Sequence, residues 1–148
     1  EAIGTASLVA GKYGYDWVPP AGNYSVRASW PGVRGTTLSA VSNSVALSVK
    51  AKPVTLAVSL SNRNVTLGRN VTISLRLSEK LSNGTVNIRY SLDGKTWVDI
   101  TSSAPKNGTL EYSWTTPTAG TIQIQAKYSG SGNFGDATSE IVILYVKK

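Results

Sequence analysis

The chain repeats itself at a spacing of about 97 residues, and this repeat restricts the possible fold more than any other feature of the sequence. In its first part the matched residues are Ile3 and Ile100, Gly11 and Gly108, Tyr15 and Tyr112, and Trp17 and Trp114. After one residue inserted in the second copy, they are Gly22 and Gly120, Val26 and Ile124, Ala28 and Ala126, Trp30 and Tyr128, and Gly32 and Gly130. Towards the end they are Ala40 and Ala137, Ser42 and Ser139, Val45 and Val142, Leu47 and Leu144, and Val49 and Val146. The same positions stay apolar in both copies, which predicts the same fold for both.

The length of the repeat sets the expected domain organisation. About 97 residues is the size of a two-sheet β-sandwich domain. We therefore expect residues 52–148 to form one complete domain and residues 1–51 to form the C-terminal half of another. Residues 51–53 form a short linker stiffened by Pro53, which predicts a semi-rigid rod of tandem domains.

Alternation of apolar and polar residues predicts strands with one buried and one solvated face. In the complete copy the predicted strands are residues 54–60, 69–77, 85–91, 96–101, 109–115, 121–128 and 139–146. Turn residues separate them, and Asp93-Gly94 predicts a tight hairpin, as Asn83-Gly84 and Asn107-Gly108 predict turns. No stretch of ten or more residues has an apolar period of 3.6 residues, so we expect an all-β fold.

Aromatic residues recur at matched positions of the two copies. Tyr15, Trp17 and Trp30 match Tyr112, Trp114 and Tyr128, which indicates that these rings fill equivalent places in two cores. The other interpretation is that some aromatic rings are exposed and stack on sugars. The candidates for this weaker hypothesis are Trp30, Trp97 and Phe134.

The half-copy needs a partner, because half of a sandwich exposes the inner face of its strands and leaves their edges unpaired. Two sources of the missing strands are open: an upstream segment of the same protein, or a neighbouring chain that adds its strands. We favour the first, since the chain has neither an initiating Met nor a leader segment and is expected to start within a longer polypeptide. The second would make the chain a filament subunit, and lateral self-association is a further expected contact.

Catalytic and metal sites are not expected in this chain. It contains no His and no Cys, so histidine-based and cysteine-based triads and sulfur-based zinc sites cannot form. Its eight carboxylates include no calcium-loop pattern and no recognisable catalytic pair. We therefore predict that the segment is not an enzyme and needs no cofactor.

Charge and hydropathy argue against nucleic-acid binding and against a membrane-spanning helix. The net charge is +7, but the Lys and Arg residues are spread along the chain without forming runs, which argues against nucleic-acid binding. No run approaches the roughly 18 consecutive apolar residues of a membrane helix, so no membrane span is expected within this segment.

Sequons for N-glycosylation bear on location. The pattern Asn-X-Ser/Thr occurs at Asn23, Asn64, Asn70, Asn83 and Asn107. If these asparagines carry glycans, the segment was translocated and is extracellular. The alternative, which carries equal weight, is that a chain rich in Ser, Thr and Asn generates sequons in its turns without using them.

One stretch of the second copy carries a family signature. Residues 128–139, YSGSGNFGDATS, resemble the Y-x-G-x-x-N-[YF]-x-x-[AS]-x-S motif of prokaryotic immunoglobulin-like repeats. The matching residues are Tyr128, Gly130, Asn133, Phe134, Ala137 and Ser139. The first copy keeps the aromatic residue and the glycine of the motif, as Trp30 and Gly32, but lacks the Asn-aromatic pair.

The resemblance implies an immunoglobulin-like sandwich in which the motif joins the last two strands. Repeats of this family occur in bacterial and archaeal surface proteins, as stalks, surface-layer components, adhesins, or spacers beside secreted catalytic domains. The expected function is therefore structural or adhesive, in an extracellular or cell-surface protein. The alternative is a carbohydrate-binding or spacer module of a secreted polysaccharide-degrading enzyme.

Overall fold

The structure is a computed structural model that describes every residue from Glu1 to Lys148. It contains thirteen strands and no helix, so the all-β class is confirmed. With no helix in the structure, none is long and apolar enough to cross a membrane. The chain divides into two compact units, Glu1–Ala51 (unit 1) and Lys52–Lys148 (unit 2), which are described separately below.

Unit 2 consists of two sheets. The first contains β10 (Thr109–Thr115), β7 (Asn70–Leu77) and β5 (Leu56–Leu60), in that order. The second has the order β6 (Asn64–Thr66), β13 (Val142–Lys147), β11 (Gly120–Ser129), β8 (Thr85–Ser91) and β9 (Val98–Ser103), with the short β12 (Ala137–Thr138) also on β11. All pairs are antiparallel except β6 with β13. The short strands β6 and β12 come in addition to the seven predicted strands.

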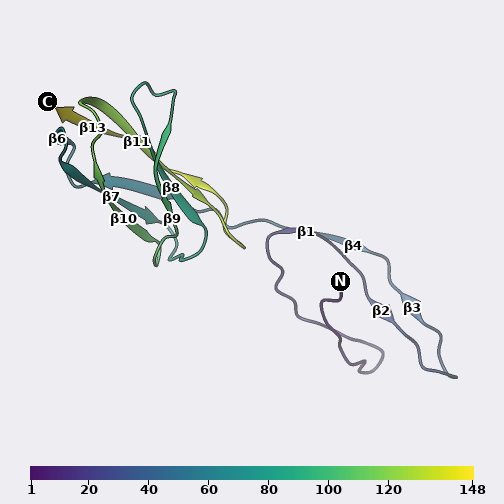
Figure 1. Cartoon of the computed structure of the whole chain (residues 1–148). Helices are drawn as coiled ribbons and strands as arrows, with labels where there is room; N and C mark the ends of the chain where they lie inside the picture. Colours follow the sequence, from purple (N-terminus) through teal and green to yellow (C-terminus); the bar gives the residue numbers. More distant parts are fainter. The chain divides into compact units, whose positions relative to one another are not determined.

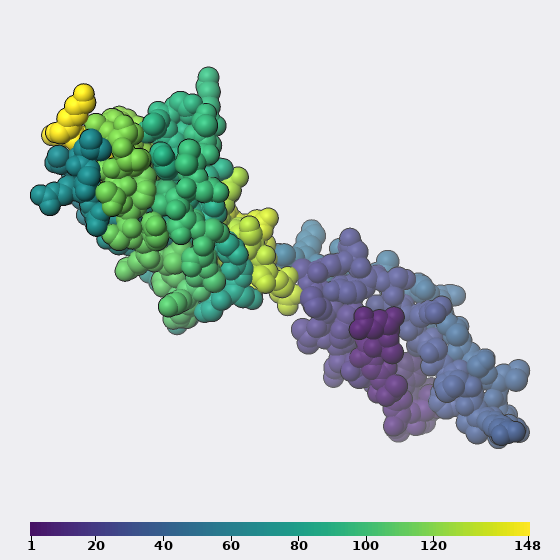
Figure 2. All heavy atoms as spheres, in the orientation of Figure 1, coloured from purple at the N-terminus to yellow at the C-terminus, as the bar shows by residue number.

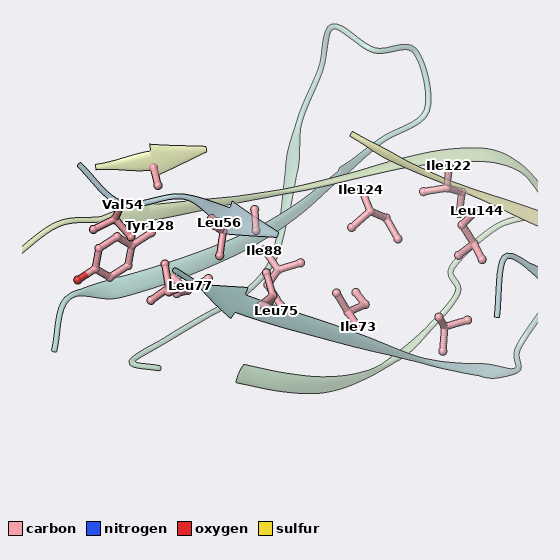
Figure 3. Close-up of a cluster of buried hydrophobic side chains, with 14 of the residues drawn as sticks. Val54, Leu56, Ile73, Leu75, Leu77, Ile88, Ile122, Ile124, Tyr128 and Leu144 are labelled. Atoms are coloured by element: carbon pink, nitrogen blue, oxygen red, sulfur yellow. The ribbon is translucent and has the colours of Figure 1, made fainter. Parts of the chain in front are cut away.

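The core of unit 2 lies between the two sheets and follows the predicted alternation. Figure 3 shows side chains from both sheets converging on this space. One sheet contributes Leu56, Val71, Ile73, Leu75 and Leu77, and the other contributes Val86, Ile88, Ile122, Ile124 and Leu144. Inner-face residues are paired across strands, as Ile73 with Leu60 and Ile124 with Tyr90. Burial of these branched side chains, worth about 1.5–3 kcal/mol each, stabilises the unit.

The expectation that all matched aromatics are core residues is wrong for Trp30, which is exposed although its match Tyr128 is buried, and for the tyrosines at one further position. Tyr112 of β10 and its match Tyr15 are both exposed, whereas Trp114 is half-buried against the core. The reason in unit 2 is topological. Tyr112 pairs with Ile73 on the inner face. Because β10 is an edge strand, no neighbouring strand covers its outer side, and Tyr112 stays partly open to solvent.

Unit 1 is a two-stranded ribbon with an N-terminal segment that forms no strand. Its strands are β1 (Gly22–Val26) with β4 (Val45–Val49), and β2 (Ser29–Trp30) with β3 (Ala40–Val41). Figure 1 shows β2 and β3 continuing the ribbon of β1 and β4. In Figure 2 openings pass between the purple and blue segments of unit 1, whereas the body of unit 2 forms a closed surface. Unit 1 contributes no residue to the buried core.

The strand register of unit 1 repeats that of β11 with β13 and β12 in unit 2. Gly22 pairs with Val49, as Gly120 pairs with Val146. Val26 pairs with Val45, as Ile124 pairs with Val142, and Trp30 pairs with Ala40, as Tyr128 pairs with Ala137. Residues matched by sequence alone therefore take matched partners in the two units.

Candidate functional site

The signature loop of unit 2, residues 128–139, is held by one hydrogen bond to a distant turn and by contacts within the motif. The hydroxyl of Tyr128 donates a hydrogen bond to the carbonyl of Asn83 over 3.1 Å, and the N–H of Gly130 donates to Oδ1 of Asp136 over 2.7 Å. A Cβ atom at Gly130 would collide with the backbone carbonyl of Phe134, so no larger residue fits there. The tyrosine, the glycine and the Asn-aromatic pair of the motif are thus parts of one folded loop.

This loop also fixes the start of unit 2. The N–H of Lys52 donates to the carbonyl of Asn133 over 2.7 Å, and the N–H of Gly135 donates to the carbonyl of Lys52 over 3.0 Å. The ammonium of Lys52 lies 2.8 Å from Oε1 of Glu79. Of the predicted linker, Lys52 therefore belongs to unit 2.

A serine at the end of the motif ties two strands together. The N–H of Ser139 donates to the carbonyl of Ala126 over 2.9 Å, and its hydroxyl accepts from the N–H of Ala126 over 3.0 Å. In unit 1 the matched Ser42 makes the same two bonds with Ala28, each over 2.9 Å. This serine clamp, defined as Ser139 with Ala126 and Ser42 with Ala28, is therefore present in both units.

Trp97 belongs to a polar cluster on unit 2. The guanidinium carbon of Arg89 lies 4.5 Å from the centroid of the Trp97 ring, a cation–π contact. Nη2 of Arg89 donates to Oε1 of Gln125 over 2.5 Å, while its Nε is buried without a partner. Sequence reasoning missed this cluster, because it depends on the pairing of Gln125 with Arg89 between β11 and β8.

The structure places the three candidate sugar-stacking residues in different surroundings. Trp30 is part of the exposed ribbon of unit 1, at the position that Tyr128 occupies in unit 2. Phe134 is half-buried and packs against the core of unit 2. Trp97 is half-buried beneath Arg89, so one face of its ring is already occupied. Phe134 and Trp97 are thus each in contact with other residues of unit 2.

Comparison with known proteins identifies the fold family. The family model described as "Bacterial Ig-like domain (group 3)" matches residues 58–147. The chain belongs to this family. The resemblance inferred from the signature loop is thereby confirmed, and the matched range runs from within β5 to the end of β13.

Other comparisons add little to the family assignment. No curated protein matches this Ig-like chain. Among solved structures, the sporulation control protein Spo0M from Bacillus subtilis is similar, with 12% sequence identity and a TM-score of 0.39. The similarity covers 64% of this chain and 49% of that one, so the chain spans about half the length of that protein.

All five sequons of this Ig-like chain present an exposed asparagine. Asn23 lies in β1, and Asn64 and Asn70 are the first residues of β6 and β7. Asn83 precedes β8, and Asn107 occupies the turn between β9 and β10. Oδ1 of Asn70 accepts a hydrogen bond from the hydroxyl of Thr115 over 2.6 Å. No sequon is placed in the core, so burial does not prevent modification of any of them.

Two ionisable groups of the Ig-like domain have shifted pKa values. Burial raises the pKa of Tyr128, and the negative charge of Asp136 adds to this. Hydrogen bonds from the backbone N–H groups of Thr96 and Lys95, over 2.7 and 2.8 Å, hold the pKa of Asp93 well below its usual range. The hydroxyl of Ser91 donates to the same carboxylate over 3.0 Å. Both groups take part in hydrogen bonds of turns and loops of unit 2.

Proposed function

We propose that this chain is a structural segment of an extracellular or cell-surface protein that is built from bacterial Ig-like domains in tandem. The observation that carries the proposal is the register of unit 1, which reproduces that of β11 with β13 and β12 residue by residue. An array of such domains serves as a stalk, a surface-layer component or a filament, and holds other parts of a protein at a distance from the cell. Lateral contacts between copies would add an adhesive role.

We also propose that the segment is not an enzyme and uses no cofactor. Nowhere does the structure bring three or more acidic side chains together in a way that suits a metal ion. A shallow hollow on the β5–β7–β10 sheet is lined mainly by small and aliphatic side chains, and Glu111 is its one carboxylate. Glycoside hydrolysis in its usual form requires two carboxylates that flank the substrate. This hollow therefore supports no hydrolytic role.

Glycans are the second part of the proposal. The exposure of Asn23, Asn64, Asn70, Asn83 and Asn107 supports their use as attachment sites on an extracellular array. Attached sugars would extend into solvent from strand ends and turns, where they would also limit edge-to-edge aggregation of strands.

The alternative function, a carbohydrate-binding or spacer module of a secreted enzyme, has narrower support. It rests on Trp97, whose ring is half-buried and in contact with Arg89. A binding platform for a polysaccharide commonly needs several aromatic rings in one plane. Trp97→Ala should abolish polysaccharide retention in a pull-down experiment if this alternative holds, and wild-type protein that shows no retention rules it out.

Two measurements on the native source test location and modification. Protease treatment of intact cells should release peptides of unit 2, and mass spectrometry of these peptides should find sugar on the sequon asparagines. Asn64→Gln should remove one glycosylated peptide, whereas Asn62→Gln, which lies outside any sequon, should not. Recovery of the protein solely from the cytoplasm, with unmodified asparagines, would contradict both parts of the proposal.

A further inference from the structure

Unit 1 leaves open the face that its counterpart in unit 2 buries. Val45 and Leu47 of β4 are 66% and 40% exposed, whereas the matched Val142 and Leu144 of β13 are 8% and 0% exposed. The backbone pairing of the two strands is the same. Exposed neighbouring apolar side chains on one strand indicate a surface that is made to be covered.

In unit 2 the corresponding face is covered by the opposite sheet, and the other edge of β11 is paired with another strand. Strands β5 and β7 lie over it and supply Leu56, Ile73 and Leu75 to the common core. Strand β8 pairs with the second edge of β11, from Gln123 with Ser91 to Ser129 with Thr85. Strands β1 and β2 pair only with β4 and β3, so the equivalent edge has no partner strand. Unit 1 therefore has both an open face and an open edge.

We propose that unit 1 binds three further strands whose apolar residues are spaced as in β5, β7 and β8. These strands belong to the same polypeptide and are joined to Glu1. The strand next to β1 and β2 would run antiparallel to them, in the register of β8 with β11. The two other strands would cover Val45 and Leu47, as β5 and β7 cover the face of β13. These strands are the partner of unit 1 in the tandem arrangement of the proposed function, and the proposal rests on that arrangement.

The connection favours strands of the same polypeptide over strands of a second chain. Residues 1–3 match residues 98–100, at the start of β9. In unit 2 the hairpin of residues 92–97 delivers the chain from β8 directly into β9. A strand attached to Glu1 through such a hairpin would reach the open edge without a crossover. It would also have a high effective concentration, whereas a separate chain loses translational freedom on binding.

Charge and size define the strand that fits next to β1. Arg27 stands at the position of Gln125, which accepts a hydrogen bond from Arg89 in unit 2. An arginine opposite Arg27 would place like charges across the strands, which destabilises a sheet. The fitting strand therefore carries Glu, Asp or Gln where β8 has Arg89. Opposite Trp30 it carries a residue no larger than Val86, since Trp30 already exceeds Tyr128 in volume.

A fusion protein tests the proposal directly. A second copy of residues 52–97 is placed before Glu1 of the full chain, with Arg89→Glu in the added copy. We expect amide hydrogen exchange of β1 and β4 to slow by about tenfold or more, because these strands gain a neighbouring strand and a buried face. The same fusion with the original Arg89 should protect β1 less. Exchange in β11 and β13 of unit 2, which the added copy lacks, reports whether the rest of the chain has folded.

Three results would overturn the proposal. The first is that β1 exchanges as rapidly with the added copy as without it, while unit 2 stays protected. The second is that an added copy with Ile88→Lys protects β1 as well as one with Ile88, which would mean that core packing plays no part. The third is that the unfused chain sediments as a dimer with β1 protected, which would make a second copy the partner. None of these results depends on where the protein is located, so they leave the test of location separate.

Discussion

Leu144 of unit 2 and Leu47 of unit 1 occupy equivalent positions in strands with the same register, yet their exposed fractions are 0% and 40%. The pairing of each strand is fixed locally, by the serine clamp and by turns within the same unit. The burial of these leucines depends on strands that are distant in the sequence. Unit 2 contains such strands, namely β5, β7 and β8, whereas unit 1 has no equivalent of them. The comparison separates the part of the Ig-like fold that forms a ribbon from the part that forms a core.

The largest difference between the units should appear in core substitutions. Leu144→Ala should lower the free energy of unfolding of unit 2 by about 2–5 kcal/mol, because it leaves a cavity in a closed core. The matched Leu47→Ala should cost under about 1 kcal/mol in unit 1, where water already reaches the side chain. Urea denaturation followed by residue-resolved hydrogen exchange measures both. Equal losses in the two units would mean that unit 1 has a core of its own.

The serine clamp gives a smaller contrast. Ser139→Ala leaves the N–H of the fully buried Ala126 without its side-chain partner and should cost about 1–3 kcal/mol. In Ser42→Ala, water can replace the hydroxyl at Ala28, so the loss should be under about 1 kcal/mol. Hydrogen exchange at the two alanine amides is the measurement. A larger loss for Ser42→Ala would contradict the view that burial sets the strength of the clamp.

Alkaline pH should weaken unit 2 through Tyr128. Its pKa is raised in the folded state from an ordinary value of 10.0, so the unfolded chain releases the proton first and stability falls as pH rises above about 10. Unfolding by urea at about pH 8 and about pH 11 should show this fall. Tyr128→Phe should remove part of the pH dependence, at a cost of about 0.5–1.5 kcal/mol for the lost bond to Asn83. An unchanged dependence in this variant would assign the effect to other groups.

The smallest expected effect is an acid sensitivity of the Asp93 hairpin in unit 2. The pKa of Asp93 is lowered in the folded state, so its contribution is present at neutral pH and is lost as pH falls below the ordinary value of 3.8. Asp93→Asn should flatten the acid side of the stability profile of unit 2. The first residues of unit 1 correspond to positions after this hairpin, so exchange in unit 1 should not respond to the substitution.

The sequence predicted strands well where alternation was long and one face was buried. Strands β8 and β10 have the predicted bounds, and Asn107 and Gly108 form the predicted turn with φ angles of 50° and 78°. It did not predict β6 or β12, because strands of three and two residues show no period. Ala10, matched to Asn107, has φ of 48°, which no residue preference would indicate for alanine.

The candidate site was predictable in its composition but not in its contacts. The motif from Tyr128 to Ser139 could be read directly, because its residues are close in sequence. Its bond to Asn83 and the contact of Phe134 with the core join segments that are distant along the chain. The cluster of Arg89, Trp97 and Gln125 likewise depends on which strands are neighbours, and this information is absent from any single stretch of sequence.

The parallel pairing of β6 with β13 determines how unit 2 would bear a mechanical load. Backbone hydrogen bonds join the last strand to a segment near the start of the unit. The N–H of Tyr145 donates to the carbonyl of Arg63 over 2.8 Å, and the N–H of Leu67 donates to the carbonyl of Lys147 over 2.8 Å. A force that pulls the two ends of the unit apart acts along these strands, so the bonds between them are sheared together rather than opened one after another. In unit 2 this edge would be the part that resists extension.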